Sequence, residues 1–486
     1  MSLDFSPSVR WLDRHIDLIL PHLETASIDR KLLQRAGEFA ILYKALRGAR
    51  GVPDDLLTRW QSVLTAYVNS QEIAEAARKS LPGAWAWLMP YFVLKHLHGH
   101  LVPEHEATME FALRAGFPYA SEVVPYRRLD QHYFLSLYEG RRLDPARFVP
   151  ATALNTCRSL LSMDRDTAYS ITHTLFYLNH FGRCQMGHDH PARGKVVLVL
   201  QSLLPHFARR GDWDVLGELL IVARCTEGFP STTLDRYLAL FQAQRDPGGY
   251  SPPSEATRQA MGDDPDRDRV FFACCHTTLV AALLDVAAPP DAEQVPHFEL
   301  EPLGQENDDH VLRRVLEARN RAVLYLNAQS ELGAHVPTFD TVVTPNGEHR
   351  DDIAGALGPD RNVVLYSLAT HADPGLDDTD ALDLAECFAR EGDVEVVARL
   401  MAVHLAQRPL NKRLAAVLDY LLQSQKPDGS VGYFLRERRL LGVGDISNIR
   451  LGLTHLFVEA VEAWLDYRIA EGRSSGESVS QPVPAA

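Results

Sequence analysis

Long apolar runs are missing from this chain of 486 residues. No segment reaches the roughly 18 uninterrupted apolar residues that a membrane-spanning helix needs. The segment 1–20 also lacks the order of basic region, apolar core and small-residue cleavage site that is typical of a secretory signal. We therefore expect a cytoplasmic protein without a transmembrane segment.

Cysteines are few, and basic residues are outnumbered by acidic ones. The six cysteines are scattered without a CxxC pair, which is typical of reduced thiols in the cytosol. Lys and Arg together number 49 against 64 Asp and Glu, so the formal net charge is −15. Nucleic-acid binding depends on Lys and Arg contacts to phosphates. We expect no nucleic-acid partner.

Several catalytic motifs are also absent. The chain has no GxxxxGK[ST] phosphate loop, no GxGxxG dinucleotide turn and no HExxH helix. The DDxxD motif with which ionising terpene synthases bind magnesium is missing as well. The sequence therefore gives no support to nucleotide-dependent chemistry, zincin chemistry or loss of a diphosphate group.

What the chain does have is helical periodicity. Apolar residues recur at three- and four-residue spacing, as in Leu12, Ile16 and Leu20, and strand-like alternation is scarce. A chain of this length usually exceeds one compact core. We predict an all-α protein in which residues 1–150 form an N-terminal helical region, with a boundary in the proline-containing stretch 145–150.

A weak repeat follows this boundary. Apolar helices in which a small or hydroxyl residue precedes a histidine recur at long intervals, at His173, His276 and His455. Apolar positions around much of each helix predict burial on two sides, as an inner helix requires. We therefore predict an (α/α)6 toroid over residues 151–470. The Ser-, Gly- and Pro-rich tail 471–486 is expected to be disordered.

An acidic segment at the start of one predicted helix is the most specific motif. Asp377, Asp378 and Thr379 follow Gly375 in the order Gly-x-Asp-Asp-Thr. This segment resembles the D-x-D-D-T signature of class II terpene cyclases, which opens an inner helix of an (α/α)6 barrel. Gly375 stands where the first aspartate of that signature belongs.

A second motif lies further along the chain. Residues 425–430 read Gln-Lys-Pro-Asp-Gly-Ser and resemble the Q-x-x-D-G-S-W motif of squalene cyclases and prenyltransferase β-subunits. Val431 replaces the tryptophan, and residues 244–250 form a degenerate copy. The physical role expected of the motif is to end a helix: glycine accepts the left-handed conformation, and the glutamine amide bonds free backbone groups.

The resemblance implies a function. It implies a noncanonical class II-like terpene cyclase or isomerase of secondary metabolism, which starts cyclisation of an isoprenoid by protonation and needs no cofactor. Asp377 would be the proton donor, because burial and the neighbouring Asp378 raise the pKa of a carboxyl group. His276 or His371 would orient or reprotonate it.

The expected ligand is a small apolar molecule. Aromatic faces shelter cationic intermediates, and His173 would line the same cavity. The aromatic residues on candidate inner helices are Phe176, Tyr177, Phe271, Phe272, Tyr325 and Tyr366. Arg127 lies in a segment with two arginines and a tyrosine, which could grip a diphosphate or carboxylate or form ion pairs with the ring.

Two other classes of function stay open. His173, His276 and His455 could converge as zinc ligands of a metal-dependent lyase or cyclase in natural-product maturation, since the related lanthionine cyclases and protein prenyltransferases carry zinc. The protein could also be a non-catalytic helical scaffold. Acidic residues at a helix start are common as caps, and histidines on apolar helices are common in cores. The oligomeric state stays open.

Overall fold

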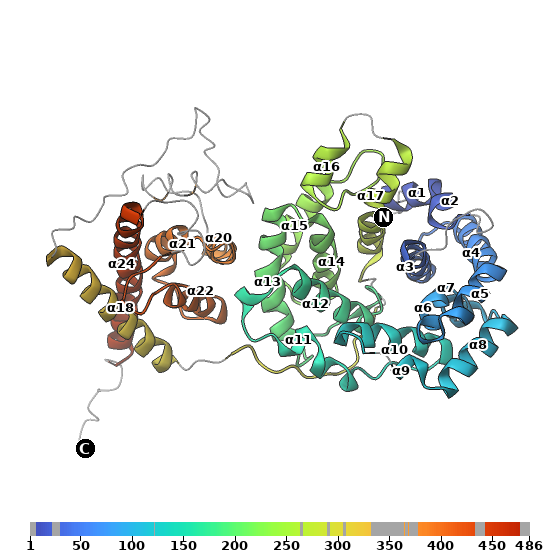
Figure 1. The fold of residues 1–486 in the computed structure, drawn as a ribbon, viewed down its shortest axis with the longest axis horizontal. Coiled ribbons are helices and arrows are strands. Elements are labelled where there is room, and N and C mark those ends of the chain that lie inside the picture. Colours follow the sequence, from blue (N-terminus) through green and yellow to red (C-terminus); the bar gives the residue numbers. More distant parts are fainter. Residues whose placement is uncertain are drawn as a thin grey trace, which may run out of the picture. The chain divides into compact units, whose positions relative to one another are not determined.

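The predicted all-α class is confirmed. The computed structural model describes residues 6–21, 30–120, 122–262, 266–288, 292–304, 308–331, 364, 368, 378–432 and 443–476. Within these residues almost all regular structure is helical (Figure 1). The exceptions are two short parallel strands, β1 (Cys184–Gln185) and β2 (Glu293–Gln294).

The chain divides into two compact units. The first contains residues 1–157 and 163–301, and the second contains residues 158–162 and 302–486. The predicted boundary near residue 150 lies inside the first unit, and the segment 151–470, over which we predicted the toroid, is shared between the two.

In the first unit, helices pack in a closed cycle. Each helix of the cycle contacts the next one along the chain, and the last helix, α17, packs against the first, α3. The cycle consists of α3 (Arg30–Arg47), α7 (Met89–His98), α10 (Pro125–Glu139), α12 (Arg165–Leu178), α14 (Trp213–Arg224) and α17 (Arg267–Val286). Three of these helices come from the predicted N-terminal region, so the ring in the structure is built from residues 30–286.

Other helices of the first unit connect and cover the ring. Helix α13 packs on α14, α4 packs on α3, and α1 packs on α17. These elements are α1 (Pro7–Arg14), α2 (Ile16–Ile19), α4 (Asp54–Val68), α5 (Gln71–Lys79), η1 (Leu81–Gly83), α6 (Ala84–Trp87), α8 (Pro103–Arg114), α9 (Phe117–Ala120), η2 (Pro145–Arg147), η3 (Val149–Ala151), α11 (Ala153–Thr156), α13 (Arg193–Arg210), α15 (Ser231–Ala243) and α16 (Glu255–Met261).

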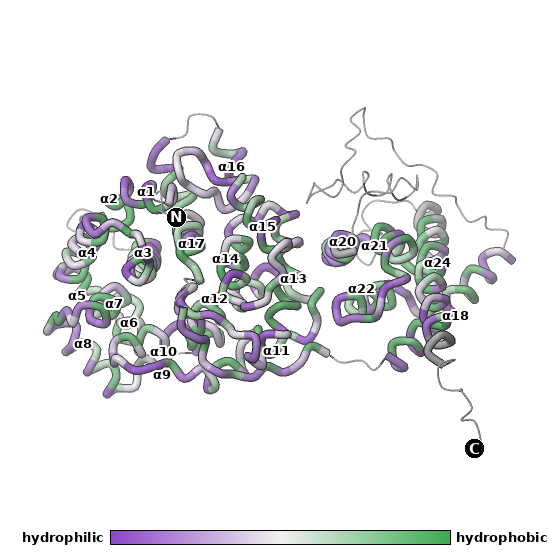
Figure 2. Tube along the Cα trace, turned by 180° about the vertical axis from the view of Figure 1, so that it is seen from behind, coloured by the Kyte–Doolittle hydropathy of each residue, from purple (hydrophilic) through white to green (hydrophobic). Residues whose placement is uncertain are grey.

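Local sequence signals explain where the ring helices begin. Asp164, Asp212 and Asp266 stand just before α12, α14 and α17, and each side chain accepts a hydrogen bond from the backbone N–H three residues later. These bonds satisfy donors that a helix start leaves free. Most helices carry both hydrophobic and hydrophilic residues (Figure 2). An amphipathic helix needs both kinds, one for its buried face and one for its exposed face.

Helix α17 is the most apolar of the long ring helices. Among the described residues it alone has the length and composition to cross a membrane, but 67% of its apolar window is buried inside the protein. It packs against α14, α3 and α1. Its apolar character is therefore explained by burial on several sides within the ring.

The second unit is a smaller helical bundle. Helix α24 packs against α18, α21 and η5 around a core that includes Phe388, Phe457 and Trp464. The elements are η4 (Leu160–Ser162), α18 (Asp308–Glu331), α20 (Asp378–Glu391), α21 (Val394–Leu400), the π-helical turn η5 (Met401–Leu405), α22 (Lys412–Gln423) and α24 (Val443–Gly476). Residues 471–476 of the predicted tail belong to α24, and residues 477–486 lie outside the described ones.

The glutamine turn behaves as the sequence indicated. Gln425 Nε2 donates to the carbonyl oxygens of Ala318 (2.7 Å) and Gly429 (3.2 Å), and Gly429 is left-handed with φ 89°. The backbone N–H of Val431 donates to Thr454 Oγ1 on α24 at 2.9 Å. The interpretation of the motif as a helix-ending turn is confirmed.

The degenerate copy forms the same kind of turn in the first unit. Gly249 has a φ of 103°, and the N–H of Asp246 donates to the carbonyl of Tyr250 at 2.9 Å. The N–H of Ser251 donates to Thr278 Oγ1 on α17 at 3.0 Å, as that of Val431 does to α24. The two units therefore contain two copies of one helical repeat.

A first prediction follows from the turn glycine. A Cβ at Gly249 would lie 2.3 Å from the carbonyl oxygen of Pro7, whereas a Cβ at the left-handed Gly99 would meet nothing within 4 Å. We expect Gly99→Ala to lower the free energy of unfolding by about 1 kcal/mol through backbone strain alone. Gly249→Ala must also displace α1, so we expect roughly 3 kcal/mol. Chemical unfolding of both variants measures the difference; equal losses would contradict the close approach of α1.

Candidate functional site

The helix ring surrounds a cavity of about 480 Å³. Every helix of the cycle contributes to its wall, and the space lies wholly within the first unit. Most of the wall is apolar or aromatic, formed by Leu33, Ile41, Trp85, Met89, Phe134, Phe176, Phe181, Leu279, Val280 and Leu283. A cavity of this size with an apolar wall and a few polar groups is typical of small-molecule sites.

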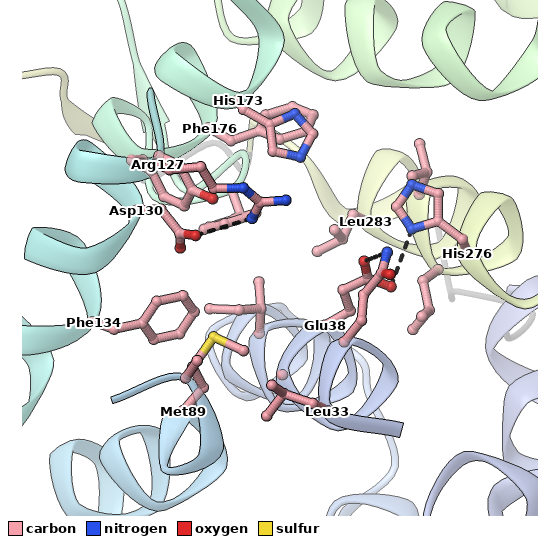
Figure 3. A pocket seen from close by; sticks show the side chains of 18 of the residues that line it. Leu33, Glu38, Met89, Arg127, Asp130, Phe134, His173, Phe176, His276 and Leu283 are labelled. Atoms are coloured by element: carbon pink, nitrogen blue, oxygen red, sulfur yellow. Dashed lines mark hydrogen bonds and ion pairs between the residues drawn. The ribbon is translucent and has the colours of Figure 1, made fainter. Parts of the chain in front are cut away.

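One side of the cavity holds a cluster of ionisable groups, which we call the His276 cluster: Glu38, Asp214, Glu218 and His276. His276 Nδ1 lies 3.0 Å from Glu38 Oε2, and its Nε2 lies 3.5 Å from Asp214 Oδ1 and 3.7 Å from Glu218 Oε1. Figure 3 shows His276 and Glu38 paired at the cavity wall. One imidazole thus faces three carboxylates.

Neighbouring hydroxyl groups fix two of these carboxylates. Thr277 donates to Asp214 Oδ1 at 2.7 Å, and Thr172 donates to Glu218 Oε2 at 2.5 Å. The other oxygen of Glu218, Oε1, has no hydrogen-bond partner among the described residues, although the side chain is only 1% exposed. Buried polar atoms are usually hydrogen-bonded. Glu218 Oε1 is close to the charge of His276 but accepts no hydrogen bond, so this part of the cavity wall has room for a hydrogen-bond donor of a ligand.

The surroundings shift the ionisation of the cluster. Burial raises the pKa of Glu218 to about 7, and the negative charge of Asp214 acts in the same direction, against the positive charge of His276 and the hydrogen bond from Thr172. Burial alone would lower the pKa of His276, but the carboxylates of Glu38, Asp214 and Glu218 outweigh it and raise that pKa well above 6.5. At neutral pH His276 is a cation, and Glu218 can both hold and release a proton.

His173 lies beside this cluster in a different state. Its ring is stacked on Tyr169 with centroids 3.8 Å apart, and its Nδ1 lies 3.0 Å from the Tyr169 carbonyl oxygen, which fixes the proton on Nδ1. Burial and the cations Arg127 and His276 lower the pKa of His173 to about 3. His173 is therefore neutral over the physiological range.

Arg127 occupies the opposite side of the cavity (Figure 3). Its Nη1 donates to Asp130 Oδ2 at 3.1 Å, and the guanidinium group lies 5.2 Å from the ring centroid of Tyr126. The Arg127 side chain is 47% exposed, and Figure 3 shows it pointing into the cavity. Burial raises the pKa of Asp130 to about 6, although the Arg127 charge opposes the shift.

The structure brings five of the residues named in the sequence analysis to this cavity: Arg127, His173, Phe176, Tyr177 and His276. Phe272, predicted to bind the substrate, is 59% exposed and does not line the cavity. Its position is explained by the turn of α17, which directs the neighbouring Phe271 into the packing with Trp11 instead.

The remaining predicted residues belong to the second unit. Tyr325 lies on α18, and Asp378 is the first residue of α20, with only its backbone described. Asp377, His371 and Tyr366 lie outside the described residues. The proton-donor role predicted for Asp377 is therefore still a prediction.

The zinc hypothesis receives no geometric support in the described part of the chain. No group of three or more His, Cys, Asp or Glu side chains there is arranged to hold a metal ion. His455 lies on α24 in the second unit, 45% exposed and 3.3 Å from Glu459 Oε1. His173 and His276 share their cavity with carboxylates, and Glu38 and Glu218 already pair with His276.

Glu38, Asp130, Asp214 and Glu218 were not predicted from the sequence. A usable signal existed for two of them: Asp214 and Glu218 are four residues apart in the otherwise apolar helix 213–224, so they share one face of it. Both are buried. A pair of carboxylates on a buried helix face is costly unless it is paired or functional.

The internal repeat provides a comparison for this pair. Asp393 caps α21 as Asp212 caps α14, each after a left-handed glycine. In the second copy, the residue that corresponds to Glu218 is Arg399, which pairs with Glu395 four residues earlier at 3.5 Å. In the second unit the charge of Glu395 is therefore balanced by Arg399 on the same helix. In the ring, Glu218 stands in place of that arginine, and its Oε1 accepts no hydrogen bond from the described residues.

Fold and site together define an all-α protein in which a ring of helices encloses a cavity with one histidine and several carboxylates on one side. The chain belongs to the family described as a domain of unknown function (DUF6895), whose model matches residues 5–286. That match ends with α17, the helix that closes the ring. Neither the curated proteins nor the solved structures include a significant match.

Proposed function

We propose that the protein is an enzyme that transfers a proton to or from a small substrate with an apolar body, bound in the ring cavity. Glu218 is the proton-transferring group, and His276 is the cation that faces it. The observation on which the proposal depends is the buried Glu218 carboxylate at the cavity wall, whose Oε1 accepts no hydrogen bond from the described residues and lies 3.7 Å from His276 Nε2. A general acid or base works best with a pKa near the working pH, and that of Glu218 is about 7.

The apolar wall supports the same proposal. Exclusion of water strengthens electrostatic interactions in an active site and suppresses side reactions, and most of the cavity wall is aromatic or aliphatic. His276 is a weak acid because its carboxylate partners stabilise the imidazolium form. We therefore assign the proton to Glu218 and assign charge balance to His276.

Isoprenoid cyclisation through Asp377, an isomerase or lyase reaction, is a separate proposal. It is supported by the Gly-x-Asp-Asp-Thr segment and by the glutamine turn, which ends its helix as in the cyclase motif. Protonation of an isolated alkene requires a strong acid. The His276 cluster instead suits proton transfer next to a carbonyl or other activating group.

Proton transfer to carbon can be measured before the substrate is known. We expect the full-length protein, incubated in deuterium oxide with a panel of medium-chain ketones, unsaturated acids and amino acids, to introduce deuterium into at least one compound. Mass spectrometry detects the added deuterons, and heat-inactivated protein gives the background. If compounds bind the cavity but none exchanges deuterium, the protein is a binding scaffold and the enzymatic proposal is wrong.

A further inference from the structure

We infer that the ligand of the ring cavity is a zwitterion with separated charges, carrying a carboxylate at one end, an amine at the other and an apolar chain between them. The carboxylate would lie at Arg127 and the amine at the His276 cluster. The inference rests on the cavity proposed above as the site. It adds the chemical class of the ligand.

The Arg127 end is positive and open. Among the described residues, Arg127 donates one side-chain hydrogen bond, from Nη1 to Asp130 Oδ2, and Figure 3 shows its side chain pointing into the cavity. A carboxylate is the group that a free guanidinium edge recognises with two parallel hydrogen bonds. A diphosphate fits less well, because one arginine already paired with an aspartate would have to balance several negative charges.

The His276 end is negative. Three carboxylates face one imidazolium group, so the His276 cluster carries net negative charge whether or not Glu218 is protonated. Arg165 also contacts this cluster, but it lies closer to Asp212, at 2.8 Å, than to Asp214, at 3.4 Å. Glu218 Oε1 can still accept a hydrogen bond. An ammonium group supplies both the charge and the donor that are missing there.

The wall between the two ends has no charge. Leu283 lies between Arg127 and the Glu38–His276 pair (Figure 3), and the uncharged side chains of Phe134 and Met89 line the same cavity. An ω-amino carboxylic acid and a short apolar peptide both offer two opposite charges across such a chain. Burying opposite charges at matching ends also penalises ligands of reversed or single charge.

Calorimetry with defined probes tests the inference. We expect one of ω-aminohexanoate, ω-aminooctanoate and ω-aminodecanoate, or the dipeptide leucyl-leucine, to bind at least about tenfold more tightly than an alkyl carboxylate or alkylamine of matching length. A preference for the dipeptide over the amino acids would identify a peptide ligand, and the opposite preference an ω-amino acid. Equal affinity of zwitterion, carboxylate and amine would overturn the inference.

Two variants test which side of the cavity binds the carboxylate of the ligand and which binds its amine. Arg127→Met should reduce the affinity of the best zwitterion to that of the amine, and Glu38→Gln should reduce it to that of the carboxylate. Because Arg127→Met leaves Asp130 buried without its partner, the double variant Arg127→Met/Asp130→Asn serves as a second test of the same end, with folding checked by circular dichroism. Unchanged affinity in both Arg127 variants would overturn the assignment.

The two proposals can fail separately. Selective binding of a zwitterion without deuterium exchange in any compound would reject proton transfer and support the ligand class. Deuterium exchange on compounds that lack either charged group, together with equal binding of the three probe types, would support proton transfer and reject the ligand class.

Discussion

Glu218→Gln is expected to reduce the rate of deuterium exchange by roughly 10² to 10⁴, the range attributed to a positioned general acid or base. Glutamine has nearly the same shape and still accepts the hydrogen bond that Thr172 donates to Glu218 Oε2. It lacks the transferable proton. The exchange rate, measured by mass spectrometry at saturating substrate, should therefore fall while the unfolding midpoint stays nearly unchanged.

The pH dependence separates catalysis from a structural role. If Glu218 acts as the base, the exchange rate rises with pH as the carboxyl group loses its proton and levels off above its pKa of about 7. The charge of Asp214 contributes to that raised pKa, so Asp214→Asn should lower the pH at which the exchange rate levels off. Glu395→Gln, at the position of the second unit that corresponds to Asp214, is the matched control. It should change neither the exchange rate nor the pH at which the rate levels off. A fully active Glu218→Gln protein would show that the proton moves elsewhere.

Arg413→Met is expected to destabilise the second unit by about 3–5 kcal/mol, the cost of removing one partner from a buried ion pair. Arg413 is 7% exposed, and it donates to Asp383 Oδ1 at 2.7 Å and to both carboxylate oxygens of Glu386 at 2.9 and 3.0 Å. Its removal leaves two buried carboxylates without their main cation. Chemical unfolding of the full chain, followed by circular dichroism, should show an earlier transition for this unit.

A matched variant and a rescue test the cause. Arg319→Met removes a more exposed pair with Glu462, and it should cost no more than about 1 kcal/mol. The triple variant Arg413→Met/Asp383→Asn/Glu386→Gln removes the stranded charges, so it should recover part of the loss. Similar losses for Arg413→Met and Arg319→Met would mean that burial of the charges is not what stabilises the unit.

The sequence alone determined the helical class and some of the turns that end helices. Three- and four-residue spacing of apolar residues fixes which face of a helix is buried. The glutamine turn at Gln425 and its copy before Gly249 were predictable because a left-handed glycine and an amide side chain act on residues next to them. His173, His276 and Arg127 were singled out in the sequence because each stands out on an apolar or aromatic segment, and all three line the cavity.

Only the tertiary structure decided which helices close the ring and what the site contains. The ring uses α3, α7 and α10 from the region we had separated at residue 150, because closure depends on contacts between helices far apart in the chain. Glu38 and Glu218 resemble any acidic residues of a helix until α3, α14 and α17 bring them to one imidazole. The raised pKa of Glu218 is a property of that enclosure, since desolvation and neighbouring charges exist only once the helices have packed.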